Sequence, residues 1–255
     1  MADNVFSKPL EVNYSEPATD CDFAEFEKVV NSRRSVRVYT PDRIPDEIVE
    51  KCLDMALLAP NSSNLQTWDF FWVQSPEKME KLKEYCLNQP AAKTSSTFIV
   101  CVARPDRWKL GQKINLDYFS RQPHIPQSAK DYYSKLAPIV YGNGPLGLLG
   151  PIKSLLINFV GLFRVIPRGP YGNKGNRLWA TKTTALACQN LMLAFRAAGF
   201  DTCPMEGFDE VRVKRLLDLP RGASVAMVIS AGRRASNGIY GPRIRGPRDQ
   251  FVHKV

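Results

Sequence analysis

The sequence is poor in residues that build metal centres. It holds only two histidines, His124 and His253, and its cysteines form no CxxC pair. HExxH and the Cys/His patterns of zinc proteins are therefore absent, and we expect no metal site. Several cysteines fall inside apolar runs, so we expect reduced, buried thiols and no disulfides. The six cysteines are Cys21, Cys52, Cys86, Cys101, Cys188 and Cys203.

Acidic residues are missing from one long stretch. No Asp or Glu lies between Tyr132 and Phe200, whereas eight Lys and Arg residues do, and the whole chain carries a net charge of +10. Such a surface favours anions: a phosphorylated cofactor, an acidic membrane face or nucleic acid. A solvated basic face is an equal alternative.

The N-terminus lacks the basic, apolar and small-residue regions of a signal sequence, which predicts a cytoplasmic protein. The 255 residues, 44% of them hydrophobic, suit one large domain or two small ones. Residues 1–22 are polar and irregular, and we expect a loose N-terminal arm there. We interpret residues 23–255 as a single domain with an apolar, basic insertion at about 104–177.

Hydrophobic periodicity predicts helices and strands mixed along the chain, which indicates an α/β or α+β class. Gly199 is the expected cap of the longest helix. The predicted helices cover residues 23–31, 46–58, a segment beginning at Ser75, 178–198 and 208–217. The predicted strands cover residues 69–74, 97–103 and 224–231.

The insertion contains a strongly apolar stretch at residues 146–166. A membrane-spanning helix is a poor fit because Pro151, Lys153 and Arg164 interrupt it. We expect an amphipathic segment that packs on the core or covers a pocket, with weak membrane-surface contact as the alternative. The GxGxxG pattern at residues 142–147 contains Pro145 and lacks a following acidic residue, so it does not indicate a Rossmann loop.

Two basic clusters suit an anion. In residues 33–39 (RRSVRVY), Arg33, Ser35 and Arg37 share a parity, so an extended chain points them to one side. Two guanidinium groups and a hydroxyl on one side of the chain are well suited to bind a phosphate. Arg243 and Arg245 alternate in the same way near the C-terminus. That second cluster also resembles a basic tail for nucleic acid, but no stacking aromatics interleave and no recognition helix is evident.

Two polar turns complete the pattern. Residues 59–68 (APNSSNLQTW) hold more hydrogen-bonding side chains than a plain turn needs. In residues 203–210 (CPMEGFDE), Pro204 and Gly207 bracket a turn that carries Glu206, and Asp209 is suited to cap the next helix.

Together these motifs resemble the FMN-dependent nitroreductase family. The family's R-R-S-x-R segment, A-P-S-S-x-N-x-Q-P-W turn, Asn-Gln pair, Q-N-x-x-L-A helix, P-x-E-G-F turn and C-terminal basic pair follow one another in the same order here. They stand at residues 33–37, 59–68, 88–89, 189–194, 204–208 and 243/245. The resemblance covers about residues 23–103 and 178–253 and leaves the insertion unexplained.

The resemblance implies an α+β fold with a central, mainly antiparallel sheet flanked by helices. It also implies an intertwined homodimer with FMN at the subunit interface. The phosphate and ribityl chain would be held by Arg33, Arg34, Ser35, Arg243 and Arg245. The flavin ring would be contacted by Arg37, Asn88, Glu206 and Gly207. The other subunit would contribute Pro60, Asn61, Ser62 and Asn64.

The implied reaction is ping-pong: NAD(P)H gives a hydride to flavin N5, leaves, and a nitroaromatic or quinone acceptor takes the electrons at the same place. This scheme needs no dedicated acid or base, so we expect no catalytic side chain in the strict sense. NAD(P)H is then a co-substrate and FMN the cofactor, with a small-molecule acceptor and no nucleic acid as partner.

The chain departs from the family pattern in places. Asn61 stands for the usual Ser and Thr67 for the usual Pro. We expect the insertion to act as a lid that favours large or hydrophobic acceptors. The alternatives are other chemistry on the same fold, such as reductive dehalogenation or flavin reduction, and a basic membrane- or nucleic-acid-binding protein without redox activity.

Overall fold

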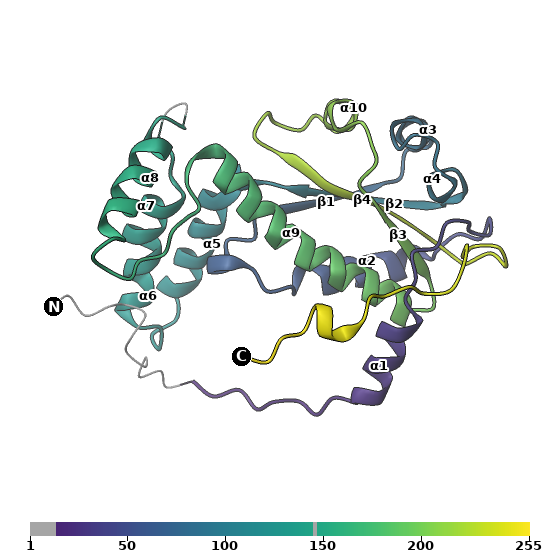
Figure 1. The fold of residues 1–255 in the computed structure, drawn as a ribbon, viewed down its shortest axis with the longest axis horizontal. Helices are drawn as coiled ribbons and strands as arrows, with labels where there is room; N and C mark the ends of the chain where they lie inside the picture. The colour runs from purple at the N-terminus through teal and green to yellow at the C-terminus, as the bar shows by residue number, and fades with distance from the viewer. Residues whose placement is uncertain (1–13, 145–146) are drawn as a thin grey trace.

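The computed structural model describes residues 14–144 and 147–255. A four-stranded antiparallel sheet in the order β1-β2-β4-β3 forms its centre, and helices cover both faces (Figure 1). The predicted α+β class with a mainly antiparallel sheet is therefore confirmed. The strands are β1 (Trp68–Val73), β2 (Thr97–Ala103), β3 (Asp201–Met205) and β4 (Ser224–Gly232).

Strand β2 lies between two hydrophobic cores, one on each face of the sheet. All seven of its residues are buried, and successive side chains point to opposite faces. Phe98 and Val100 face the core under α3 (Pro76–Tyr85), α4 (Pro90–Thr94) and α10 (Glu210–Leu216). Ile99 and Cys101 face the core under α2 (Asp46–Leu57) and α9 (Gly172–Ala197). An apolar run without alternation is what a strand covered on both faces requires.

Helix α9 begins six residues before its predicted start. An added Cβ at Gly150 would lie 2.5 Å from the Gly172 Cα, so glycine lets the two backbones meet where α9 begins. The predicted cap is confirmed, because Gly199 has a φ of +87°. All six cysteines are free thiols, and only Cys21 is exposed.

Strand β3 was missed, since residues 203–210 read as a turn. Pro204 lies within this strand and pairs with Ile229. Proline is tolerated there because β3 is the last of the named strands, with only an isolated bridge at Thr202 on its outer side. The predicted cap is confirmed, because Asp209 accepts a hydrogen bond from the Arg212 N–H at 3.0 Å.

The residues of the insertion form a helical lobe around the N-terminal half of α9 (Figure 1). Its residues 145 and 146 lie outside the described part of the chain. No helix within residues 14–144 and 147–255 is long and apolar enough to cross a membrane. The elements are η2 (Pro105–Arg107), α5 (Trp108–Ser120), α6 (Gln127–Asp131), the π-helical η3 (Tyr132–Leu136), α7 (Ala137–Tyr141) and α8 (Leu149–Val160).

Both ends of the described chain are exposed. Helix α1 (Phe23–Ser32) has no buried residue. Residues 14–22 are exposed and outside regular structure, and residues 241–255 are exposed and include only the short η5 (Arg248–Gln250). The arm predicted at residues 1–22 lies outside the described residues up to residue 13. The boundaries of the predicted domain and insertion stay predictions.

Candidate functional site

The first basic cluster lies along the outer edge of the sheet. Ser35 forms a parallel bridge with Thr202 of β3, and the Val36 N–H donates to the Thr202 carbonyl at 3.0 Å. The Arg37 N–H donates to the Gly238 carbonyl at 2.7 Å. Arg33 and Arg37 therefore lie on an extended segment with a fixed backbone, which confirms the extended conformation expected for them.

The C-terminal arginines fold back onto the same segment. Arg243 Nη2 donates to the carbonyls of Asn31 at 2.8 Å and Arg33 at 2.6 Å. Arg34 Nη2 donates to the Gly241 carbonyl at 2.6 Å. Arg243 thus satisfies carbonyls at the C-terminal end of α1, a favourable place for a cation. Sequence reasoning assigned Arg34 and Arg243 to phosphate binding alone and missed this contact between the two clusters.

The cluster is short of negative charge. Burial, and then the charges of Arg243, Arg245 and Arg34, lower the pKa of Arg33. Asp201 is the acid nearby, but it already binds Arg196 at 3.0 Å and Arg234 at 2.6 Å. Neither the Arg33 nor the Arg37 guanidinium makes a hydrogen bond to a described residue. Cations held together without a carboxylate are suited to binding an external anion.

The turn after β3 is joined to the Asn-Gln pair. Gln89 Nε2 donates to the Gly207 carbonyl at 2.7 Å, and an added Cβ at Gly207 would lie 3.3 Å from that nitrogen. Asn88 has a φ of 51°, and Asn88, Glu206 and Gly207 are all exposed. Within the described chain the Gly207 N–H has no acceptor, so it is available to a ligand. Gln89 was identified in the sequence as part of the Asn-Gln pair, but its hydrogen bond to the Gly207 turn was not predicted.

The loop of residues 59–68 adopts an unusual backbone. Ser63, Asn64 and Gln66 have φ values of 55°, 45° and 48°, a region that residues other than glycine rarely occupy. Asn61 Oδ1 accepts from the Gln66 N–H at 2.8 Å and holds the bend together. Pro60, Ser62 and Asn64 are exposed.

The insertion braces this loop. Ser63 Oγ lies 2.5 Å from the Tyr132 hydroxyl and 2.8 Å from the Tyr141 hydroxyl. The Tyr133 hydroxyl donates to the Ser63 carbonyl at 2.8 Å. Asn64 Nδ2 donates to Asn115 Oδ1 at 2.9 Å, and Asn115 Nδ2 donates to the Asn64 carbonyl at 2.8 Å. These partners were missed, because nothing in the sequence pairs positions up to 78 residues apart.

One chain does not bring all of these residues together. The loop leads into Trp68, which lies opposite Ala103 and so at the Ser224 end of β4. The basic cluster bridges to Thr202, which pairs with Ala231 at the other end of β4. Seven residues of strand separate the two ends, about 24 Å. The basic cluster and the loop therefore lie at opposite ends of the sheet, and the Gly207 turn follows Met205, which pairs with Val228 between them.

Proteins of known sequence and structure share this fold. DrgA of Synechocystis is 28% identical over 211 residues, covering 82% of this chain and 83% of that protein. A protein of Exiguobacterium sibiricum solved in complex with FMN superposes with a TM-score of 0.67 at 24% identity, covering 95% and 100% of the two chains. The NADPH:FMN oxidoreductase of Vibrio harveyi, solved with NAD⁺, gives 0.59 at 19%, covering 90% and 76%.

At these sequence identities, similarity to the two solved structures shows the fold alone. The family model is the stronger finding, because it spans residues 30–233 and so includes the first basic cluster, the loop, the Gly207 turn and the whole sheet. The chain belongs to the Nitroreductase family.

Proposed function

We propose that the protein is an FMN-dependent oxidoreductase that takes reducing equivalents from NAD(P)H and passes them to a nitroaromatic or quinone acceptor. The observation that carries the proposal is the unpaired arginine cluster around Arg33. A flavin phosphate bears close to two negative charges and requires several fixed cations. Relatives solved with FMN or named as NADPH:FMN oxidoreductases support the choice of anion.

The residues present fit FMN. Arg33, Arg34, Ser35 and Arg245 would hold the phosphate and ribityl chain, while Arg243 keeps the end of α1 in place. When bound, FMN supplies reversible acceptance of a hydride from NAD(P)H. Arg37 would stabilise negative charge on the pyrimidine edge, and Asn88 would hydrogen-bond to that edge. The free Gly207 N–H would orient the ring, with Glu206 beside it.

The flavin absorption spectrum of the purified protein provides the direct test. We expect the purified protein to be yellow, with flavin absorption that bleaches on addition of NADPH and returns with menadione. Arg33→Ala/Arg37→Ala should lose the flavin, whereas Arg43→Gln, an exposed arginine without a described partner, should keep it. A colourless protein that gains no absorption from added FMN would refute the proposal and favour a binding protein without redox activity.

We further propose that two subunits complete each site. The loop and the basic cluster lie at opposite ends of one sheet, so a loop from a second subunit is needed beside the cluster. Exposed apolar side chains provide a surface for that subunit: in α1 Phe23 and Phe26 are 76% and 55% exposed, and in the tail Ile244 and Phe251 are 82% and 70% exposed.

Subunit complementation tests this arrangement. One variant carries Arg33→Ala and Arg37→Ala, and the other carries Ser62→Ala and Asn64→Ala. Each variant alone should retain little FMN. After unfolding and refolding together, a mixed dimer has one site with both halves intact, so flavin should return to about one site in two of the mixed dimers. If flavin does not return although mixed dimers form, both halves come from one chain.

The acceptor is proposed to be large or hydrophobic, because the insertion contacts the loop. Apolar side chains of α8 and the following turn are exposed at helical spacing, with Leu155 77%, Phe159 60% and Phe163 75% exposed. Replacing these three residues with Gln should lower kcat/KM for menadione more than for a small nitroaromatic. Equal effects on both acceptors would refute a lid that selects by hydrophobicity.

The same exposed side chains favour weak contact with an anionic membrane surface, since Arg164 and Arg168 adjoin them and no acid lies between Tyr132 and Phe200. Sedimentation with vesicles containing phosphatidylserine should exceed sedimentation with phosphatidylcholine alone, and the triple Gln variant should abolish the difference. Equal sedimentation of wild type and variant would contradict membrane contact.

A further inference from the structure

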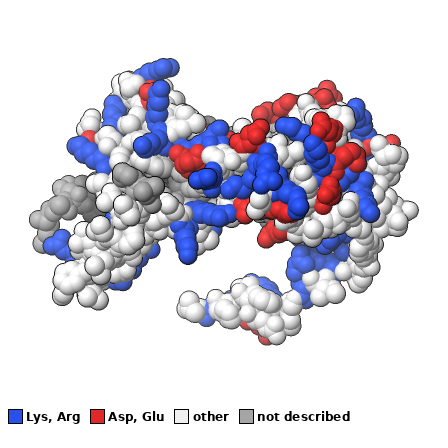
Figure 2. All heavy atoms as spheres, turned by 90° about the horizontal axis from the view of Figure 1, so that it is seen from above, with Lys and Arg blue, Asp and Glu red and all other residues white. Residues whose placement is uncertain are grey.

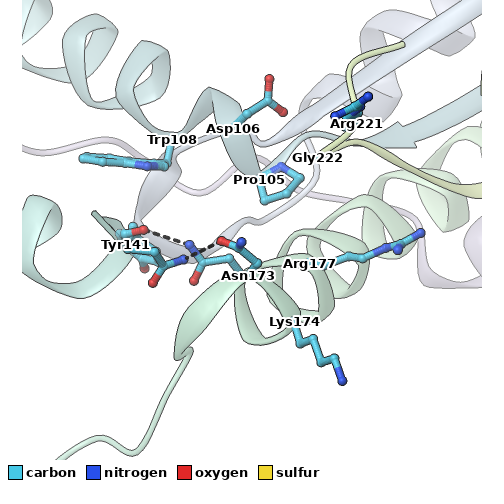
Figure 3. Close-up of a pocket in the computed structure, with 11 residues that line it drawn as sticks. Pro105, Asp106, Trp108, Tyr141, Asn173, Lys174, Arg177, Arg221 and Gly222 are labelled. Atoms are coloured by element: carbon cyan, nitrogen blue, oxygen red, sulfur yellow. Dashed lines mark hydrogen bonds between the residues drawn. The ribbon is translucent and has the colours of Figure 1, made fainter. Parts of the chain in front are cut away.

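A cavity of about 480 Å³ lies beside the start of α9 (Figure 3). Its lining includes Gly222, which precedes the Ser224 end of β4, whereas the arginine cluster bridges to Thr202 opposite Ala231. Its walls come from η2 and the start of α5, the end of α7, the first turns of α9 and the loop before β4. Its volume falls within the range of small-molecule sites. None of the residues placed in the flavin site lines it.

Two amide oxygens in this cavity lack partners. Asn176 is 95% buried (5% exposed) and donates from Nδ2 to the Tyr141 carbonyl at 2.8 Å, but its Oδ1 is buried without a hydrogen bond. Asn143 Nδ2 lies 3.5 Å from Asn173 Oδ1, and Asn143 Oδ1 is likewise unsatisfied. Buried acceptors without donors are costly. A ligand with N–H groups would satisfy them once either side chain turned towards the cavity, because both oxygens are covered by the cavity wall.

The cavity also carries positive charge. Lys174, Arg177 and Arg221 line it, and the N-terminal end of α9 adds the partial positive charge of a helix start. Arg177 is paired with Glu210 at 2.7 Å, whereas Lys174 and Arg221 have no acidic partner among the described residues. The acid at the rim, Asp106, is already bound by Arg104 at 2.7 Å. An anionic group is therefore favoured.

An aromatic ring completes the lining. Trp108 lies on one side of the cavity and Arg221 on the other, with Asn173 between them in the view of Figure 3. Trp108 is half-buried, and Tyr141 stacks on Trp179 at 4.3 Å, which fixes the wall beside it. Half-exposed indoles stack readily on planar bases.

We propose that this cavity binds a nucleotide, with its base against Trp108 beside Asn143 and Asn176, and its phosphate near Arg221. The nucleotide is either free or the adenosine phosphate half of the NAD(P)H co-substrate. Only the second of these sources rests on the proposed function.

Titration of the full-length protein with 5′-AMP, followed by calorimetry, tests the site without any turnover. We expect saturable binding that Arg221→Gln weakens about tenfold, the effect of losing one charge-assisted contact. Adenosine, which lacks the phosphate, should bind wild type and Arg221→Gln equally. Arg43→Gln is the matched control, since it also removes an exposed arginine without a described partner, and it should bind 5′-AMP like wild type.

A second variant tests whether Arg221→Gln weakens binding only through a long-range change in charge. An added Cβ at Gly222 would meet no heavy atom within 4 Å, so Gly222→Leu should narrow the cavity without loss of thermal stability and should abolish binding. Absence of saturable 5′-AMP binding up to about 10 mM, or equal affinities of wild type, Arg221→Gln and Gly222→Leu, would overturn the proposal.

Kinetics then separate the two sources. If the nucleotide is part of the co-substrate, Arg221→Gln should raise KM for NADPH with kcat unchanged, and 5′-AMP should compete with NADPH. If it is a free nucleotide, KM for NADPH should stay the same in the variant. Either result supports the site. Loss of flavin binding leaves the 5′-AMP titration unaffected, so failure of the proposed function is recognised separately.

Discussion

The Tyr141 hydroxyl lies 2.8 Å from the Ser63 hydroxyl, although 78 residues separate them in the chain. Tyr141 ends α7 of the insertion, and Ser63 lies at the centre of the loop that is proposed to contact the flavin of the partner subunit. The contact gives the insertion a positioning role, because it stabilises a residue whose φ of 55° is otherwise unfavourable.

Tyr141→Phe should therefore weaken FMN binding without unfolding the protein. The variant removes only the hydroxyl that contacts Ser63 and keeps the ring that stacks on Trp179. Loss of the part-buried hydrogen bond to Ser63, together with the longer contact to Ser62 Oγ at 3.4 Å, corresponds to about a fivefold increase in the Kd for FMN, measurable by flavin fluorescence. Tyr118→Phe is the control, since Tyr118 is 56% exposed and its hydroxyl contacts no described residue. An unchanged Kd in Tyr141→Phe would remove the positioning role.

Gly111→Ala should have a larger effect on the same loop. A Cβ at Gly111 of α5 would lie 2.7 Å from the Leu65 Cα and closer still to the Leu65 carbonyl. Leu65 is 1% exposed and packs in the core of the insertion, so the loop backbone has little room to move. We expect a loss of about 2 kcal/mol in unfolding free energy together with loss of FMN. Gly222→Ala is the control, since an added Cβ there meets no heavy atom within 4 Å, and it should leave both quantities unchanged.

The sequence predicted this fold where the signal was local. The buried strand at residues 97–103, the Asp209 cap and the Gly199 cap each follow from neighbouring residues, and each agrees with the structure. Strand β3 was missed because its extended conformation depends on pairing with β4, and Pro204 gives a turn signal that this pairing overrides.

The candidate site likewise contains residues that a sequence pattern predicts and residues whose contacts depend on the folded structure. The arginines and the Gly207 turn could be proposed from the sequence because their order along the chain matches a family pattern. The tyrosines and Asn115 that hold Ser63 and Asn64 were missed, since their contacts arise only once the insertion folds back on the loop. The cavity beside α9 was missed for the same reason, because its lining comes from four separate segments.

Alkaline pH should destabilise the protein through its buried cysteine thiols and the Tyr133 hydroxyl. Burial raises the pKa of Cys52 from 9.0 to about 11, that of Cys86 from 9.0 to about 12, and that of Tyr133 from 10.0 to about 12. At pH 8 these groups are mostly protonated in both the folded and the unfolded states. As pH rises towards the folded-state pKa values, the unfolded chain loses protons first, so stability falls.

The expected loss between about pH 8 and pH 10 is about 2 to 3 kcal/mol, measured by urea unfolding. Other groups also titrate in this range, so a Cys52→Ala/Cys86→Ala variant provides the comparison. Its unfolding free energy will be lower at pH 8 because two buried side chains are shortened, but it should change less between the two pH values. The same pH dependence in wild type and variant would show that the thiols do not cause it.

Arg33→Gln should separate stability from cofactor binding. Burial and the neighbouring arginines lower the Arg33 pKa, which means that its charge is unfavourable in the folded protein without a bound anion. Removing the charge should leave the Tm of flavin-free protein equal to or above that of wild type, as measured by differential scanning calorimetry. The Kd for FMN should rise about tenfold or more, because one phosphate contact is lost. Arg43→Gln should change neither quantity. A lower Tm combined with an unchanged Kd would show that Arg33 stabilises the end of α1 and that the anion binds elsewhere.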